Sequence, residues 1–66
     1  MDKLLEFKAM RIRKGLTQIE LSRRMNMSQQ AVSQWESGRS KPPVNILRRL
    51  ANTLEVDVEE LIQCFE

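Results

Sequence analysis

The stretch TQIELSRRMNMSQQAVSQWESG, residues 17–38, contains the signals for two short helices separated by a tight turn. Thr17 and Glu20 have the T-x-x-E spacing of a capping box, in which each side chain bonds the backbone N–H of the other residue at a helix start. Asn26 lies where the chain must turn, and asparagine tolerates the positive φ that such a turn requires. Ser28 is a suitable N-cap for a following helix. The stretch therefore predicts one helix before Asn26 and a second just after Ser28.

The second of these helices is predicted to run to about Ser37, because Gly38 is suited to end a helix. On a helical wheel its apolar residues fall on one side, namely Ala31, Val32 and Trp35. The opposite side carries only amides and hydroxyls, from Gln29, Gln30, Ser33, Gln34 and Ser37. A merely solvated face is normally rich in Lys and Glu, whereas Gln can bond adenine through two atoms and Ser can bond several base edges. This face therefore indicates a helix that binds the edges of nucleic-acid bases. The alternative interpretation is a polar face that has no partner.

Three further helices are predicted around this unit. The first runs roughly over residues 3–14 and is stopped by Gly15, and the fourth runs over about residues 43–54. A short fifth helix follows Asp57, which together with Glu60 has the spacing of a second capping box. No stretch alternates polar and apolar residues with a period of two, so no sheet is expected. The predicted fold class is a compact all-α domain of five helices.

Length and composition limit what such a chain can do. Its 66 residues predict a single domain, residues 1–66, with a thin core that leaves little room for an enclosed enzyme pocket. Histidine is absent and cysteine occurs only at Cys64, which argues against zinc sites, thiol–imidazole pairs and Ser–His triads within one chain. No apolar run exceeds two residues, so neither a signal peptide nor a membrane span is expected. We therefore expect a cytoplasmic protein that is not an enzyme.

Charge is distributed unevenly along the chain. Residues 1–41 contain nine Lys/Arg and four Asp/Glu, a net charge of +5, whereas residues 42–66 have a net charge of −3. A basic first part and an acidic last part favour a polyanionic partner that is met on one side only. The alternative is a chance segregation of solvated charges.

The ordered residues of the central stretch and its flanks resemble the phage repressor/Cro-like (xenobiotic-response-element type) helix-turn-helix family. The resemblance covers residues 4–62 and rests on Thr17-Gln18-x-Glu20-Leu21-Ser22, Met27-Ser28-Gln29-Gln30-x-Val32-Ser33-x-Trp35-Glu36-x-Gly38, Lys41-Pro42 and Leu47…Leu50-Ala51…Leu54. It implies a lambda-repressor-like fold, with the helix-turn-helix at about residues 17–37, and a prokaryotic or phage-encoded origin. Many relatives have Gly where this chain has Asn26 and Glu55, and often a capping Ser where it has Pro43.

The resemblance also implies a role for individual residues. Base edges would be read by Gln29, Gln30, Ser33 and Gln34. DNA phosphates would be bound by Gln18, Ser28, Arg39, Ser40 and Lys41. A partly buried ion pair between Arg11 and Glu36 would hold the reading helix at its angle. Neither a cofactor nor a metal is implied.

The function expected from these residues is sequence-specific binding of double-stranded DNA by a transcriptional regulator, a repressor acting as a homodimer on a palindromic operator. Specificity in such small modules usually comes from two copies on two half-sites. A tentative dimer patch is formed by the surplus apolar residues Ile46, Val56, Ile62 and Phe65, which could equally cover the thin core. The alternative function is a protein-interaction module on the same fold, such as an antitoxin-like partner.

Other conspicuous residues have ordinary structural interpretations. Trp35 is expected in the core or as a packing wedge against the fourth helix, and Cys64 is expected to be a partly buried thiol. Arg48 and Arg49 are interpreted as surface charges on the fourth helix.

Overall fold

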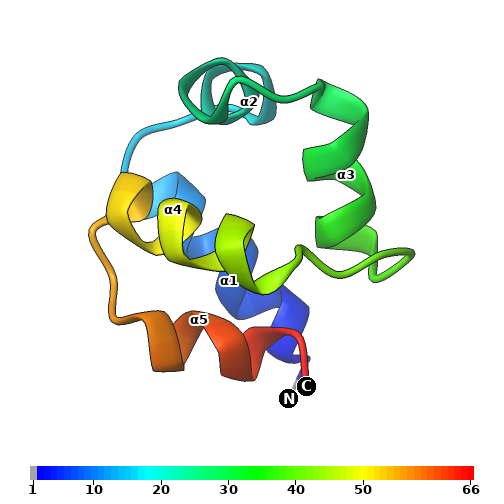
Figure 1. Ribbon diagram of the computed structural model, residues 1–66, viewed down its shortest axis with the longest axis vertical. Coiled ribbons are helices and arrows are strands. Elements are labelled where there is room, and N and C mark those ends of the chain that lie inside the picture. The colour runs from blue at the N-terminus through cyan, green and yellow to red at the C-terminus, as the bar shows by residue number, and fades with distance from the viewer. Residues whose placement is uncertain (1) are drawn as a thin grey trace.

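Five α-helices form the described part of the protein, as the sequence predicts. The computed structural model describes residues 2–66 and contains α1 (Lys3–Arg13), α2 (Gln18–Met25), α3 (Gln29–Ser37), α4 (Val44–Leu54) and α5 (Val58–Cys64). No strand occurs among these described residues. α2 and α3 pack against each other, α1 contacts both α3 and α5, and α4 connects to α2 and α5 (Figure 1). The predicted all-α, five-helix fold is confirmed, and α3 lies at one side of the molecule.

The helix starts that flank the central turn follow the sequence signals. The Glu20 backbone N–H donates to Thr17 Oγ1 at 3.1 Å, and the Thr17 N–H donates to the Glu20 carboxylate at 3.0 Å. This reciprocal pair is the predicted capping box. Ser28 caps α3 by accepting the Ala31 N–H at 3.1 Å. Both helices of the unit thus begin at residues whose side chains bond otherwise unpaired backbone groups.

The second predicted capping box is wrong in its detail. Asp57 is the N-cap of α5, but its carboxylate accepts the N–H of Glu59 at 2.8 Å. The reciprocal bond that defines a capping box, from the Asp57 backbone N–H to the Glu60 carboxylate, is not formed in the described chain.

Two residues other than glycine adopt the left-handed conformation at helix ends. Asn26 has φ 55° after α2, and Glu55 has φ 57° after α4, where many relatives have Gly. The Glu55 carboxylate pairs with the Lys14 ammonium at the end of α1. The chain therefore makes the same turn between α4 and α5 that a glycine would allow, with backbone strain at Glu55 partly offset by this contact.

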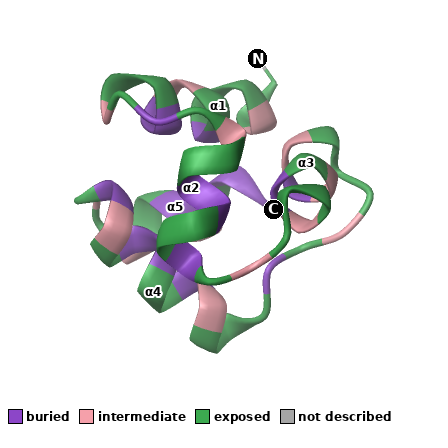
Figure 2. Cartoon of the chain, turned by 90° about the horizontal axis from the view of Figure 1, so that it is seen from above, coloured by how far each residue is buried: buried purple, intermediate pink, exposed green. Residues whose placement is uncertain are grey.

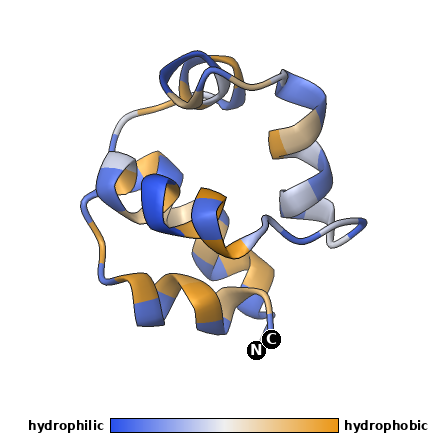
Figure 3. Cartoon of the chain, viewed as in Figure 1, coloured by the Kyte–Doolittle hydropathy of each residue, from blue (hydrophilic) through white to orange (hydrophobic). Residues whose placement is uncertain are grey.

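One hydrophobic core joins all five helices. Each of the five helices contributes buried residues (Figure 2), and the largest fully buried side chains are Phe7, Leu21, Met25, Val32, Leu50 and Leu61. Trp35 is 3% exposed and belongs to this core, as predicted. Leu21 begins the inward face of α2, because Ile19 is 44% exposed. Hydrophobic residues face the interior on α3, whereas hydrophilic residues occupy its outer side (Figure 3).

Phe65 lies in the core, which contradicts its place in the predicted dimer patch. It is 7% exposed and its ring packs on Phe7 with centroids 5.0 Å apart. The other three residues of that patch, Ile46, Val56 and Ile62, are half-buried and pack against the edge of the core. Phe65 is buried because the chain turns back after α5 and brings this ring against α1.

Candidate nucleic-acid interface

The outer face of α3 is a continuous surface of amides and hydroxyls. Gln29, Gln30, Ser33 and Ser37 are exposed and Gln34 is half-buried, and together with Arg39 these residues line one shallow surface hollow. The side chains of Gln29, Gln30 and Ser33 form no hydrogen bond with another described residue. Their donors and acceptors are therefore available to an external partner.

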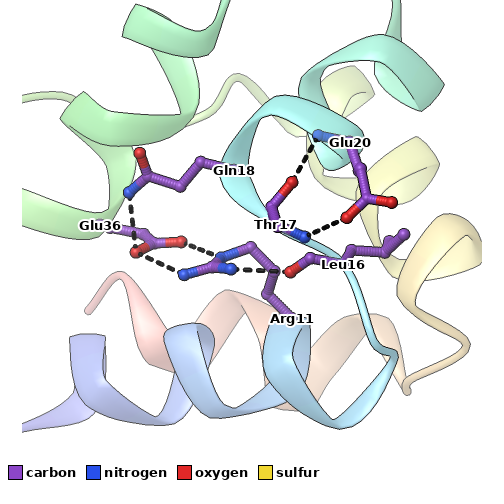
Figure 4. Close-up of polar contacts among 6 residues, drawn as sticks. All are labelled: Arg11, Leu16, Thr17, Gln18, Glu20 and Glu36. Carbon is purple, nitrogen blue, oxygen red and sulfur yellow. Dashed lines mark hydrogen bonds and ion pairs between the residues drawn. The ribbon is translucent and has the colours of Figure 1, made fainter.

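A buried ion pair connects this helix to α1. Arg11 Nε lies 2.5 Å from Glu36 Oε2, and a second guanidinium nitrogen lies 3.4 Å from Oε1 (Figure 4). A third guanidinium nitrogen donates to the Leu16 carbonyl at 2.7 Å. Each side chain of the pair is only 9% exposed. Because little water reaches these charges, Arg11 and Glu36 constrain the position of α3 more strongly than a surface ion pair would.

Gln18 joins the same network from the first position of α2. Its amide nitrogen donates to Glu36 Oε1 at 3.1 Å (Figure 4). One amide hydrogen and the side-chain carbonyl remain for another partner. The start of α2 is thus tied to α3, a link that the family resemblance does not predict, since it implies only a phosphate contact for Gln18.

The loop after α3 folds back on the end of that helix. The backbone N–H groups of Arg39 and Ser40 both donate to the Gln34 carbonyl, at 3.0 and 3.4 Å. Arg39 and Lys41 are exposed, and Ser40 is half-buried. Arg39 therefore places one positive charge beside the amide face of α3, whereas Ser40 and Lys41 line a separate hollow together with the start of α1 and residues 64–66.

Comparison with known proteins decides the family. Residues 7–61 match the family model described as helix-turn-helix. The chain belongs to the helix-turn-helix family. This is a family of transcriptional regulators rather than enzymes, and the fold expected from the sequence resemblance agrees with it.

Two curated relatives are helix-turn-helix regulators. The chain is 45% identical over 56 residues to the uncharacterized HTH-type transcriptional regulator y4dJ of Sinorhizobium fredii (strain NBRC 101917 / NGR234), covering 85% of this chain and 73% of that protein. It is 34% identical over 53 residues to the HTH-type transcriptional activator BcrR of Enterococcus faecalis, covering 80% of this chain. The match spans only 26% of the length of BcrR. No solved structure matches significantly. None of the described helices is long and apolar enough to cross a membrane.

One contact of α4 with the helix-turn-helix is not predicted from the sequence. Arg49 is exposed, as expected of a surface charge, but its guanidinium also donates to the Met25 carbonyl at 2.6 Å. Met25 is the last residue of α2, so this bond lies at the turn itself. No signal in the sequence reveals the contact, because it depends on how α4 packs against α2. Arg48, its neighbour, is exposed as predicted.

Two titratable groups near the helices have shifted pKa values. The Thr17 backbone N–H, and then the Thr17 side chain, lower the pKa of Glu20, with smaller effects from Arg24 and Arg23. Burial raises the pKa of the Cys64 thiol, and the carboxylates of Glu6 and Glu60 add to this shift. A thiol kept protonated is a poor nucleophile and metal ligand. No cluster of metal-binding side chains occurs in the part of the chain that the structure describes.

Proposed function

We propose that this protein is a sequence-specific double-stranded DNA-binding repressor that acts as a homodimer on a palindromic operator. The observation that carries this proposal is the polar face of α3, on which Gln29, Gln30 and Ser33 are exposed and form no hydrogen bond with another described residue; the Arg11–Glu36 pair holds this helix in place. A helix of this width fits the major groove, where each base pair presents a distinct set of donors and acceptors.

In this proposal α3 reads bases and its surroundings bind phosphates. The bases are read by Gln29, Gln30, Ser33 and Gln34. The phosphates are bound by Gln18, Ser28, Arg39, Ser40 and Lys41. The Ser28 oxygen already accepts the N–H of Ala31, so its O–H is the group that donates to a phosphate. The remaining amide hydrogen of Gln18 serves the same purpose at the start of α2.

A second copy is proposed to bind the other half-site. The patch is now limited to three half-buried residues, Ile46, Val56 and Ile62, since Phe65 is in the core. Two half-sites about one helical turn apart are the geometry expected of such a dimer. Sedimentation of the protein with and without operator DNA tests the stoichiometry, and Ile62→Glu should weaken pairing. A wild-type protein that stays a monomer on its operator would contradict the dimer.

The decisive experiment is selection of randomised duplex DNA by the purified protein, followed by sequencing of the bound pool. We expect an enriched palindrome. Gln29→Ala and Gln30→Ala should each cost about 1–3 kcal/mol on the selected site and relax the preference at one position. Lys41→Ala is the matched control. Loss of a phosphate contact weakens binding to all DNA sequences alike, and it reduces the slope with which the logarithm of the binding constant falls as the salt concentration rises. No enrichment would refute DNA reading and favour a protein-interaction module.

The direction of regulation is tested separately. Repression follows from steric exclusion of polymerase by a protein bound across the promoter. A reporter gene behind the selected operator should therefore lose transcription when the protein is expressed. A rise in transcription would instead agree with the activity named for BcrR and would overturn the repressor assignment.

A further inference from the structure

Among the described residues, Arg49 makes the only hydrogen bond between a charged side chain of α4 and the α2–turn–α3 unit. The residue lies on the exposed side of α4, yet its guanidinium reaches the Met25 carbonyl at 2.6 Å. Met25 itself is 1% exposed and ends α2. A charged donor therefore bonds the backbone at the point where the chain leaves α2 for the reading helix.

The Met25 carbonyl needs this partner. Within the turn, the Met27 N–H donates to the Ser22 carbonyl at 2.8 Å and the Asn26 N–H donates to the Arg23 carbonyl at 3.1 Å. These bonds use the Ser22 and Arg23 carbonyls and leave those of Arg24 and Met25 at the end of α2, and Arg49 bonds the second of these. The guanidinium supplies a donor and also a positive charge at the negative end of the helix dipole.

A second contact from α4 holds the same residue. Thr53, one turn after Arg49, places its hydroxyl 3.4 Å from Met25 Sδ and 3.0 Å from the Arg49 carbonyl. Met25 is therefore held by its backbone through Arg49 and by its side chain through Thr53. The two contacts come from one face of α4, so the orientation of α4 is transmitted to the end of α2.

We propose that Arg49 is a positioning residue that sets the direction in which α3 leaves the turn. Asn26 follows Met25 directly in the left-handed conformation, and Ser28, the N-cap of α3, comes two residues later. A rotation at Met25 therefore displaces the start of α3, where Gln29 and Gln30 lie. This inference rests on the proposed DNA reading by α3, and it assigns to Arg49 no contact with DNA.

The test uses Arg49→Met, which keeps the side-chain stem, with Arg48→Met as the matched control. Arg48 is the adjacent exposed arginine and has no hydrogen bond or ion pair within the described chain, so both variants lose one positive charge from α4. The measured quantity is the ratio of Kd values for a scrambled duplex and for the selected operator, together with the salt dependence of each. We expect Arg49→Met to reduce this ratio about tenfold with an unchanged salt slope, because a displaced α3 loses about one good base contact of Gln29 or Gln30 while the phosphate contacts remain. Arg48→Met should leave the ratio unchanged.

Three results would overturn the proposal. An equal loss of affinity for all DNA sequences, together with a salt slope reduced by about one, would mean that Arg49 binds a phosphate. An unchanged Kd ratio for the folded fraction of Arg49→Met would mean that the bond to the Met25 carbonyl stabilises the fold without affecting DNA reading. Equal effects of Arg48→Met and Arg49→Met on the Kd ratio would mean that the loss of any positive charge from α4 explains the change and that the Met25 contact has no part in it. If Arg49→Met does not fold, Arg49→Lys keeps a donor and the charge, and it should retain most of the ratio while Thr53→Val lowers it.

A measurement without DNA separates this inference from the proposed function. Residual dipolar couplings of the free protein report the angle between α2 and α3. This angle should change in Arg49→Met and stay constant in Arg48→Met, even if the wild-type protein selects no DNA sequence. An unchanged angle in a folded Arg49→Met protein would overturn the positioning role, whatever the DNA selection shows.

Discussion

Removal of Glu36 should destabilise the protein far more than a surface ion pair would. The Glu36 carboxylate accepts three hydrogen bonds, two from Arg11 and one from Gln18, and the side chains of the pair are each 9% exposed. Glu36→Ala leaves the guanidinium in this site with the Leu16 carbonyl as its remaining partner. Breaking a buried pair from one side costs about 3–5 kcal/mol, and we expect a loss near the lower end because of that remaining bond.

This loss is large for a chain of this size. Small domains have about 0.05–0.15 kcal/mol of stability per residue, which is about 3–10 kcal/mol here. A loss of about 3 kcal/mol corresponds to a fall in Tm of roughly 12–24 °C for a domain of this length. Urea titration followed by the fluorescence of Trp35, the only tryptophan and 3% exposed, measures the free energy of unfolding directly.

The chain provides a matched control for the effect of burial. Arg13 and Glu6 form an ion pair at 2.6 Å, nearly the same distance, but their side chains are 65% and 55% exposed. Glu6→Ala should cost less than about 1 kcal/mol because water screens the exposed pair. A cost for Glu36→Ala as small as that for Glu6→Ala would refute the reasoning.

A double substitution separates the pair from the individual charges. Arg11→Met with Glu36→Leu removes both charges and fills the site with apolar side chains. The double variant should be more stable than Glu36→Ala, because it leaves no charge unpaired, but less stable than the wild type, because the Leu16 carbonyl loses its Arg11 donor. A double variant as unstable as Glu36→Ala would show that the unpaired charge is not the main cost of the single change.

Three further changes test the helix ends. Gly38→Ala should lower the free energy of unfolding by about 1–3 kcal/mol, because φ is +81° and the new Cβ would lie 2.9 Å from Leu4 Cδ1; urea titration measures it, and an unchanged midpoint would contradict the strain. Glu55→Gly should raise Tm, since relief of the left-handed strain, about 1–2 kcal/mol, exceeds the loss of one surface ion pair; a lower Tm would show that the ion pair dominates. The pKa of Glu20 is lowered in the folded state by hydrogen bonds from Thr17, so its contribution to stability is present above the pKa of glutamate in the unfolded chain and is lost as the pH falls through the lower, folded value. Glu20→Gln should therefore weaken the acid dependence of stability between neutral and acidic pH, and identical pH profiles of the two proteins would exclude this role.

Several features of the site could be predicted because they depend on residues close in the sequence. The Thr17–Glu20 capping box and the turn at Asn26 involve neighbours, and the amide face of α3 follows from helical periodicity alone. The pairing of Arg11 with Glu36 came only from resemblance to relatives, since these residues are 25 positions apart. Glu55 shows the limit of composition rules, because a residue unsuited to positive φ still forms the turn.

The sequence by itself determined the five helices, their ends and the polar face of α3, since hydrogen bonds and side-chain periodicity along one helix involve only nearby residues. The tertiary structure alone decided which side chains meet across helices. It buried Phe65 against Phe7, joined Gln18 to Glu36 and brought Arg49 to the carbonyl of Met25, 24 positions away. Such contacts depend on the direction in which each helix packs, and that direction is set by the shape of the whole core.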